Sequence, residues 1–403
     1  MDATTSRLAH LDKTNWLIVT IGITALAVAM GIGRFAFTPL MPLMLRDATL
    51  TLVSSAEWAA ANYFGYLIGA LSAAWFSKNP RCGLKVALIG VTLATLAVAA
   101  IGQASPPHIG ALLRCAAGLF SAWTLISTSG WALVELARRQ APQLGAWIYV
   151  GVGLGIVLAG ALAWLGGGQP ARWLWLEMGL LAAVAALFIF LRLDEAGAVT
   201  DSTAVALPRA AAQSQLPLVL CYGTFGFGYI VPATFLPAMA RQKVDDPLVF
   251  GLIWPLFGLA AAISVMVAAR FLSAWPRRRV WALAQGTMAI GTAMPLAMPS
   301  LWGLTISAVL VGGTFMVVTM AGMQLARERL PANPTSLLAR MTAAFAAGQI
   351  MGPLLVRALS PVRFAGWGAL EWASLAAMVS LLVSAAWLWR LNHHDHHDQH
   401  NIR

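Results

Sequence analysis

The sequence predicts an all-α integral membrane protein with twelve transmembrane helices in two pseudo-symmetric six-helix bundles. The first observation is composition: 59% of the 403 residues are hydrophobic and only 10% are charged, whereas soluble domains carry about 25% charged residues. The second is that apolar runs of membrane-spanning length recur along the chain. The third is a motif in the first run that returns in the middle of the chain. The bilayer is therefore the expected solvent for most of the chain.

The apolar runs divide into two sets of six. They lie at about 16–43, 54–77, 84–103, 108–136, 143–166 and 172–192, and then at about 216–240, 248–270, 279–298, 301–326, 336–358 and 364–390. Most reach the roughly 20 residues that a helix needs to cross a bilayer, and lipid offers no partner to unpaired backbone groups, so we expect helices. The polar stretch between the sets predicts an N-terminal bundle over 1–192, a cytoplasmic linker over 193–215 and a C-terminal bundle over 216–403 with a His-rich cytoplasmic tail.

An internal repeat supports the two sets. Residues of the first run recur 195 positions later: Gly31, Gly33, Pro42 and Met44 as Gly226, Gly228, Pro237 and Met239. Residues 118–124 match 313–319 at the same spacing, and Gly151 and Gly155 correspond with a small slip to Gly348 and Gly352. We interpret two sets of glycines as close-packing surfaces between helices: Gly151, Gly153 and Gly155, and Gly348 with Gly352. Parallel repeats of six spans characterise one large class of transporters.

Basic residues orient the chain. If the N-terminus is inside, 18 Lys and Arg fall in cytoplasmic segments and 6 in outer ones, and Arg34 and Arg114 lie within spans. The positive-inside rule then predicts that both termini are cytoplasmic. The net charge of +11 follows from short basic clusters at span ends, which disfavours a nucleic-acid partner. The expected partners are a small-molecule substrate, protons as an optional co-substrate, and the lipid bilayer, and the expected state is a monomer.

Cysteine and histidine patterns give no sign of a metal, a cofactor or an enzyme. Cys82, Cys115 and Cys221 are odd in number and far apart, so neither a disulfide framework nor a metal spacing is present. No His lies within a span, so a membrane-embedded enzyme would lack a nucleophile with its base. The tail NHHDHHDQHNIR favours a disordered polar end; if it is helical, its His pairs four residues apart are able to chelate a divalent metal.

Three segments carry a family resemblance: GRFAFTPLMPLM at 33–44, EWAAANYFGYLIGA at 57–70 and AFAAGQIMGPLL at 344–355. With the repeat, they resemble the major facilitator superfamily, and more narrowly its YbfB/YjiJ branch of bacterial transporters. The resemblance implies the major facilitator fold, a bacterial inner (plasma) membrane location, and a cavity lined mainly by spans 1, 4, 7 and 10. The loop after span 2 keeps Lys78, Arg81 and Lys85 but lacks the usual aspartate. Arg114 occupies the span-4 position that the superfamily's proton-coupled exporters link to proton coupling, with Ala117 where Gln is common.

Arg34 is the strongest candidate for a functional residue. It lies about ten residues before the outer end of its run, some 15 Å deep at 1.5 Å per residue, so its side chain should face a cavity or a partner rather than reach the interface. The alternative is a packing arginine bonded to carbonyl groups that Pro39 and Pro42 release. Its repeat position holds Tyr229, and this asymmetry favours a specific role.

Further candidates surround Arg34 in the predicted bundle. We expect substrate binding by Arg34, Asn62, Tyr63, Tyr66, Arg114, Trp123, Tyr229 and Gln324. Proton coupling is expected from Glu57 with Arg114, although Glu57 at a helix N-terminus is also a favourable cap. Arg114 could alternatively anchor the helix or bond carbonyls of spans 1 and 2. For Trp123, Tyr229 and Gln324, packing or lipid-facing positions are the competing interpretation.

A set of charged residues near the cytoplasmic span ends predicts gating contacts: Lys78, Arg81, Glu135, Arg138 and Glu328. Glu135 and Glu328 correspond in the repeat and lie beside basic residues. We interpret them as ion pairs that break and form as the bundles rock, and a solvated salt bridge is the alternative.

Together these features predict a secondary active transporter of a small organic molecule that works by rocker-switch alternating access, with proton-coupled efflux. The shortage of buried acids disfavours a polycation substrate and favours an anionic or neutral one. The alternatives are an importer or uniporter of the same fold, or a ligand sensor that does not transport.

Overall fold

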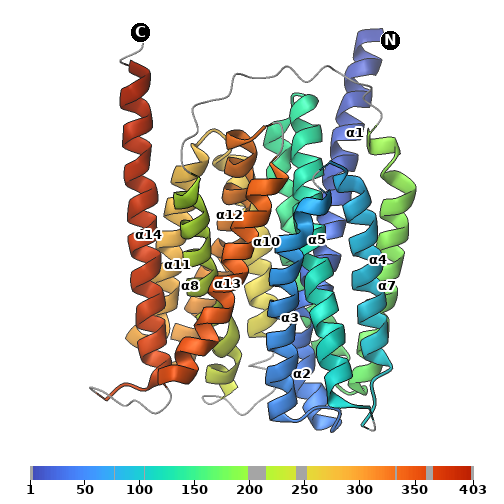
Figure 1. Ribbon diagram of the computed structural model, residues 1–403, viewed down its shortest axis with the longest axis vertical. Helices are drawn as coiled ribbons and strands as arrows, with labels where there is room; N and C mark the ends of the chain where they lie inside the picture. Colours follow the sequence, from blue (N-terminus) through green and yellow to red (C-terminus); the bar gives the residue numbers. More distant parts are fainter. Residues whose placement is uncertain are drawn as a thin grey trace.

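The computed structural model describes residues 3–76, 78–103, 105–197, 215–241, 252–331, 334–359 and 366–400. Its helices form two groups that stand side by side, the first half of the chain on one side and the second half on the other (Figure 1). α1 begins and α14 ends at the same end of the molecule (Figure 1). We call this end the terminal face and the opposite end the far face.

In the part of the chain that the structure describes, six helical crossings make up each group. In the first they are the following: α1 Ala3–Leu26 continued by the π-helix η1 Ala27–Phe35 and α2 Phe37–Arg46, α3 Leu52–Ser72, α4 Pro80–Ala99, α5 Pro107–Arg138, the 3₁₀-helix η3 Pro142–Tyr149 continued by α6 Val150–Leu165, and α7 Ala171–Arg192. In the second they are α8 Leu216–Arg241, α10 Ile253–Phe271, α11 Arg277–Ala297, α12 Leu301–Arg329, α13 Thr335–Leu359 and α14 Ala369–His400. Short 3₁₀ segments, η2 Ala73–Phe76 and η4 Glu195–Gly197, complete the first half.

The prediction of twelve transmembrane helices in two six-helix bundles is confirmed by this arrangement. Within the described residues, nine of the crossings are long and apolar enough to span a membrane by themselves. The other three, α3, α11 and α13, carry buried amides at Asn62, Gln285 and Gln349. The predicted linker over 193–215 lies mostly outside the described residues.

The tail expectation differs from the structure. We expected a disordered polar end, but α14 runs as helix to His400. The segment after Arg390 contains neither Gly nor Pro, so no residue there interrupts the helix.

Glycines give the two bundles the same internal packing. A side chain on Gly31 of the first crossing would collide with the backbone of Gly155 in α6. In the second bundle, a side chain on Gly348 in α13 would collide with the backbone of Gly223 in α8. In each bundle the first crossing therefore touches the fifth backbone to backbone, as small residues allow. The prediction that Gly155 and Gly348 are close-packing positions is confirmed.

The bundles meet through apolar surfaces. α6 packs against α10 and α3 against α13. The Phe35 ring of η1 reaches across to Trp254 of α10 and Phe315 of α12, with centroids 6.1 Å and 6.2 Å apart. Aromatic pairs at such distances are favourable contacts beyond the area that they bury. The middle of the molecule is thus filled by rings contributed from both halves.

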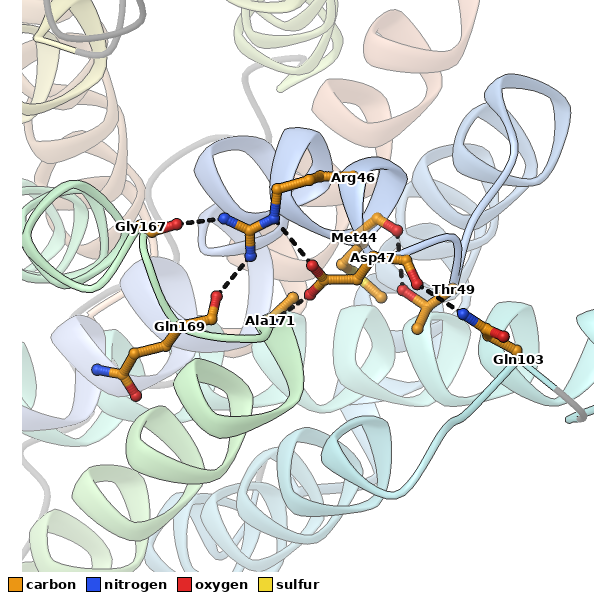
Figure 2. Close-up of polar contacts among 8 residues, drawn as sticks. All are labelled: Met44, Arg46, Asp47, Thr49, Gln103, Gly167, Gln169 and Ala171. Atoms are coloured by element: carbon orange, nitrogen blue, oxygen red, sulfur yellow. Dashed lines mark hydrogen bonds and ion pairs between the residues drawn. The ribbon is translucent and has the colours of Figure 1, made fainter.

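Three loops of the first bundle are tied together at the far face (Figure 2). Arg46 donates hydrogen bonds to the carbonyl oxygens of Gly167 and Gln169 and pairs with Asp47 at 2.9 Å. The other Asp47 carboxylate oxygen accepts from the backbone N–H of Ala171, the first residue of α7, at 2.6 Å. A carboxylate at this position satisfies a helix N-terminal donor and complements the helix dipole.

Asp47 also binds the loop before α5, and its own contacts keep its carboxylate ionised. Its backbone oxygen accepts from the side-chain amide of Gln103 at 3.0 Å. Burial raises the pKa of Asp47, but the hydrogen bonds from Arg46 and Ala171 and the charge of Arg46 outweigh burial and hold the pKa below its usual value. The carboxylate therefore stays ionised at neutral pH.

Candidate functional site

Arg34 lies at the centre of the bundle interface and is shielded from solvent, with 3% of its surface exposed. Its Nη2 donates a hydrogen bond to Oε1 of Gln349, a fully buried residue of α13 in the other bundle. Because arginine has only donors, the Gln349 oxygen must be the atom that faces it. The guanidinium thus forms a direct polar contact between the two halves of the molecule.

Four aromatic rings surround the Arg34 guanidinium. Its Cζ atom lies 4.0 Å from the ring centroid of Tyr66, 5.2 Å from Phe35, 5.7 Å from Phe345 and 5.8 Å from Tyr63. The negative face of a ring attracts a cation within about 6 Å of its centroid, and more strongly where water is excluded. These rings, from both bundles, hold the charge in the apolar interior.

The π-helix η1 presents Arg34 and exposes backbone carbonyls. A π-helix closes its hydrogen bonds over five residues instead of four, and such segments recur at functional sites. Ser121 of α5 donates to the carbonyl oxygen of Ala29 at 2.7 Å. Arg114 of the same helix donates to the carbonyl oxygens of Gly33 and Arg34 at 3.0 and 2.9 Å. Side chains of α5 therefore support the segment that carries Arg34.

Arg114 is buried, and its contacts fit the interpretation of a side chain bonded to span-1 carbonyls. Its guanidinium lies 5.1 Å from the Phe37 ring and 5.7 Å from the Trp175 ring. Asn62 of α3 donates to the Arg114 backbone oxygen at 2.9 Å. Arg114 thus holds the backbone at Arg34, and Asn62 in turn bonds the backbone of Arg114.

Two other predicted site residues come from the second bundle. Tyr229 of α8 is fully buried; its ring stacks on Phe315 at 5.1 Å and on Phe345 at 6.0 Å, and its hydroxyl has no hydrogen-bond partner. Gln324 of α12 is buried near Gly145 of η3, and neither its amide oxygen nor its nitrogen is hydrogen-bonded. Tyr229 thus shares the Phe345 ring with Arg34, whereas Gln324 faces the first bundle at another position.

The structure does not bring Trp123 or Glu57 into the Arg34 group. Trp123 of α5 donates its indole N–H to Ser72 at 2.9 Å and packs against Phe76 with centroids 4.9 Å apart, all within the first bundle. Glu57 of α3 is exposed and belongs to none of the ion pairs found among the described residues.

The charged residues near the terminal face pair within bundles. Glu135 binds Arg139 of the same helix at 3.0 Å, both nearly buried, while the predicted neighbour Arg138 is exposed. Glu328 lies 3.6 Å from Arg277 of α11. Lys78 is exposed, and Arg81 lies 6.0 Å from the Trp131 ring. The described pairs of Glu135 and Glu328 are therefore each made inside one half.

Gln349 and Ser121 are the site residues that sequence reasoning missed. Gln349 lies within the segment 344–355 already noted for its family resemblance, where it is the one amide in an apolar run. That polarity was the available signal. Ser121 carried no such signal in the sequence, because a serine in a membrane helix commonly bonds the backbone of its own helix.

Two repeated six-helix bundles that meet around buried polar residues are the plan of one large class of membrane transporters, in which substrates bind where the repeats meet. A family model described as "Uncharacterised MFS-type transporter YbfB" matches residues 26–387. The chain therefore belongs to this family of the major facilitator superfamily, whose members are transporters and not enzymes. It acts on a small-molecule substrate within a membrane.

A solved structure supports the fold. The crystal structure of the human organic anion transporter MFSD10 (TETRAN) superposes with a TM-score of 0.67 at 16% sequence identity, over 94% of this chain and 99% of that one. At this identity the likeness concerns the fold. A comparison with curated proteins gives no match.

Proposed function

We propose that this protein exports a small organic molecule by rocker-switch alternating access, with the substrate held beside Arg34. The observation that carries the proposal is the solvent-shielded guanidinium with its Gln349 contact, since it joins a charged group to both bundles. The geometry of a site contacted by both halves changes when the halves move relative to one another. Substrate binding at such a site is therefore able to bias that motion. Asn62, Tyr63, Tyr66, Arg114 and Tyr229 would shape or support this site, whereas Gln324 and Trp123, which lie apart from Arg34, would contact the substrate elsewhere along its path.

The proposed setting is a bacterial inner membrane with both termini in the cytoplasm, and the proposed unit is a monomer. The three-to-one excess of basic residues in the inner segments supports this orientation. In that frame, Lys78, Arg81, Glu135, Arg138 and Glu328 lie on the cytoplasmic side. We propose that Glu135 and Glu328, each paired inside its own bundle in this structure, exchange partners when the cytoplasmic side opens.

Export is proposed to be driven by protons. Glu57 is exposed on the far-face half of α3, where an outside proton could reach it, and Arg114 lies deeper on the neighbouring helix. A carboxylate that takes up a proton on one side and releases it on the other supplies the coupling. Collapse of the pH gradient should then abolish uphill flux, and Glu57→Gln should do the same while Glu177→Gln, a half-buried carboxylate in α7, should not.

The experiment starts with purified protein. A thermal-shift screen of metabolites and drugs selects compounds that stabilise it, and their flux is then measured in proteoliposomes with and without a pH gradient. Arg34→Ala should abolish both stabilisation and flux, whereas Arg172→Ala, an exposed arginine of α7, should change neither. The human MFSD10 structure bears the name of an organic anion transporter, which is a reason to include organic anions in the screen.

The outcomes separate the alternatives. Flux that is independent of the pH gradient would indicate a uniporter, and inward accumulation would indicate an importer. A compound that binds at Arg34 but is never moved would indicate a sensor. Stabilisation that survives Arg34→Ala would contradict the proposed location of the site.

A further inference from the structure

The Arg34 site is short of negative charge. Among the described residues, every ion pair between side chains lies elsewhere in the molecule, and none includes Arg34 or Arg114. The four rings around Arg34 attract its charge but do not neutralise it. A buried cation without a counter-ion is expensive in a membrane protein and usually marks a binding site.

Within the residues that the structure describes, the site also holds hydrogen-bond donors that have no acceptor, and beside them only the unpartnered hydroxyl of Tyr66 is able to accept a bond as well as donate one. The Nε and Nη1 atoms of Arg34 are buried and have no hydrogen-bond partner, and neither has the Nε2 atom of Gln349. All three atoms are donors. The hydroxyl of Tyr229, one ring away across Phe345, is also without a partner and is able to donate. Buried donors are nearly always paired in native proteins, so the site is built to receive a group rich in lone pairs.

A carboxylate supplies both the missing negative charge and the missing hydrogen-bond acceptors. It carries one negative charge, and its two oxygens match the fork of N–H groups on a guanidinium. The faces of Phe35, Tyr66 and Phe345 beside the guanidinium suit an apolar or aromatic body attached to that carboxylate. The chemistry of the site therefore favours an organic monocarboxylate.

Gln349 already occupies one of the acceptor positions on Arg34. Its amide oxygen is the uncharged counterpart of a carboxylate oxygen, and it reaches Arg34 from the opposite bundle. A carboxylate adds charge–charge attraction and a second, parallel N–H···O bond to the guanidinium, both of which a single neutral amide oxygen lacks. A substrate carboxylate is thus the stronger competitor for the same Nη2 atom.

We infer that Gln349 is a placeholder for the substrate: an organic carboxylate displaces its amide oxygen from Arg34 and in doing so breaks a polar link between the bundles. The inference rests on the proposed transport function and adds to it a substrate class and a coupling residue. Because the ligand favours the state in which Gln349 is released, binding shifts the equilibrium toward separation of η1 from α13.

The test uses the purified full-length protein and matched probes. Aliphatic and aromatic monocarboxylates, led by octanoate and benzoate, are each compared with their primary amides by thermal shift. Carboxylates should stabilise the protein and the isosteric amides should not. Gln349→Glu places a carboxylate permanently beside Arg34 and should weaken binding of the carboxylates about tenfold or more, which corresponds to 1.4 kcal/mol.

Two further variants complete the test. Gln285→Glu makes the same substitution in α11, where the side chain accepts from Trp281, and should leave carboxylate binding unchanged. Gln349→Ala removes the competitor without adding charge, so carboxylate binding should be as tight as in the wild type or tighter. This variant decides the matter even if Gln349→Glu fails to fold.

Three results would each overturn the inference: amides that bind as well as carboxylates, carboxylates that bind Gln349→Glu like the wild type, or a panel in which no carboxylate binds either the wild type or Gln349→Ala. None of these would remove the transport proposal, because flux of an uncharged compound in proteoliposomes tests that separately. A fourth result, loss of carboxylate binding in Gln349→Ala alone, would overturn the placeholder role and would make Gln349 a direct ligand.

Discussion

Two buried arginines lie on neighbouring helices near one another, and their hydrogen bonds give them different roles. Arg114 bonds the carbonyl oxygens of Gly33 and Arg34 through Nη1 and Nη2, and only its Nε has no partner. Arg34 bonds Gln349 through Nη2, and both its Nε and its Nη1 have no partner. An arginine with most of its bonds to backbone carbonyls supports the fold, whereas one with two adjacent nitrogens unbonded is available to a ligand.

At the residue scale, Arg114→Ala should therefore destabilise the protein even without substrate. It removes two hydrogen bonds from a charged donor, each worth about 1.5 to 3 kcal/mol, and leaves two carbonyls of η1 without partners. Removal of a buried charge offsets part of this, so we expect a net loss of about 3 kcal/mol. Arg114→Lys should recover only part of it, since one ammonium lacks the planar fork that bonds both carbonyls.

The measurement is the apparent melting temperature in detergent, with Arg172→Ala as the control for loss of an exposed arginine. If Arg114→Ala melts like the wild type but loses ligand stabilisation, Arg114 is a substrate contact instead of a support. Residue identity alone left this choice open, because an arginine in a span is compatible with both roles.

At the scale of elements, the glycine contacts between first and fifth crossings set how closely each bundle packs. Gly348→Ala would push a methyl group into the backbone of Gly223, and backbone is unable to move aside as a flexible side chain does. Overpacking of this kind costs about 1 to 3 kcal/mol. Gly286→Ala in α11 is the matched control, because no atom lies within 4 Å of the added methyl.

We expect Gly348→Ala to lower the melting temperature and the yield of monodisperse protein, and Gly286→Ala to leave both unchanged. Equal behaviour of the two variants would contradict backbone contact between α8 and α13. Because Gly348 lies one residue from Gln349, ligand binding is best compared only after the stability difference has been measured.

The far-face loops offer a second test at the element scale. Asp47→Asn keeps an oxygen for the Ala171 N–H but removes the charge that pairs with Arg46 and complements the start of α7. Charge at a helix N-terminus is worth about 1 kcal/mol at a partly exposed site, so Asp47→Asn should be less stable than the wild type by about that amount.

The stability difference between the wild type and Asp47→Asn should decrease as the pH falls and not as it rises. The pKa of Asp47 is lower in the folded protein than its usual value, so its contribution is complete above that usual value and is lost as pH falls through the folded pKa. The melting-temperature gap between wild type and Asp47→Asn should be constant from about pH 7 to 5 and should narrow only below about pH 4. A gap that closes already near pH 6 would show that another group controls these loops.

The sequence predicted much of the architecture and only part of the site, for physical reasons. Apolar runs must be helices in lipid, and a repeat such as Gly31 with Gly226 specifies two similar bundles. The π-helix was not predicted, because its extra residue per turn changes hydrogen bonding without changing composition. Gln349 was missed because its role depends on a contact across 315 residues of sequence. The burial of Arg34 was predicted because of its depth in the first apolar run, and its functional role stays a prediction.

At the scale of the whole molecule, the decisive question is whether the two bundles separate. Near the far face, a side chain on Gly160 of α6 would contact the Pro255 ring of α10 at 3.0 Å, so the halves touch there. A rocker-switch transporter must part these helices to open toward that side. Joining them covalently should therefore stop transport without unfolding either bundle.

The experiment replaces the three native cysteines, of which Cys82 is exposed, by serine or alanine and introduces Gly160→Cys with Pro255→Cys. Oxidation should form a disulfide, abolish flux in proteoliposomes, and release it again on addition of dithiothreitol; each single cysteine variant should transport normally under both conditions. Thermal stability of the oxidised protein should not fall, because the two helices are already in contact. Undiminished flux through the fully cross-linked protein would mean that α6 and α10 stay together during the cycle. The bundles would then have to separate between other pairs of helices.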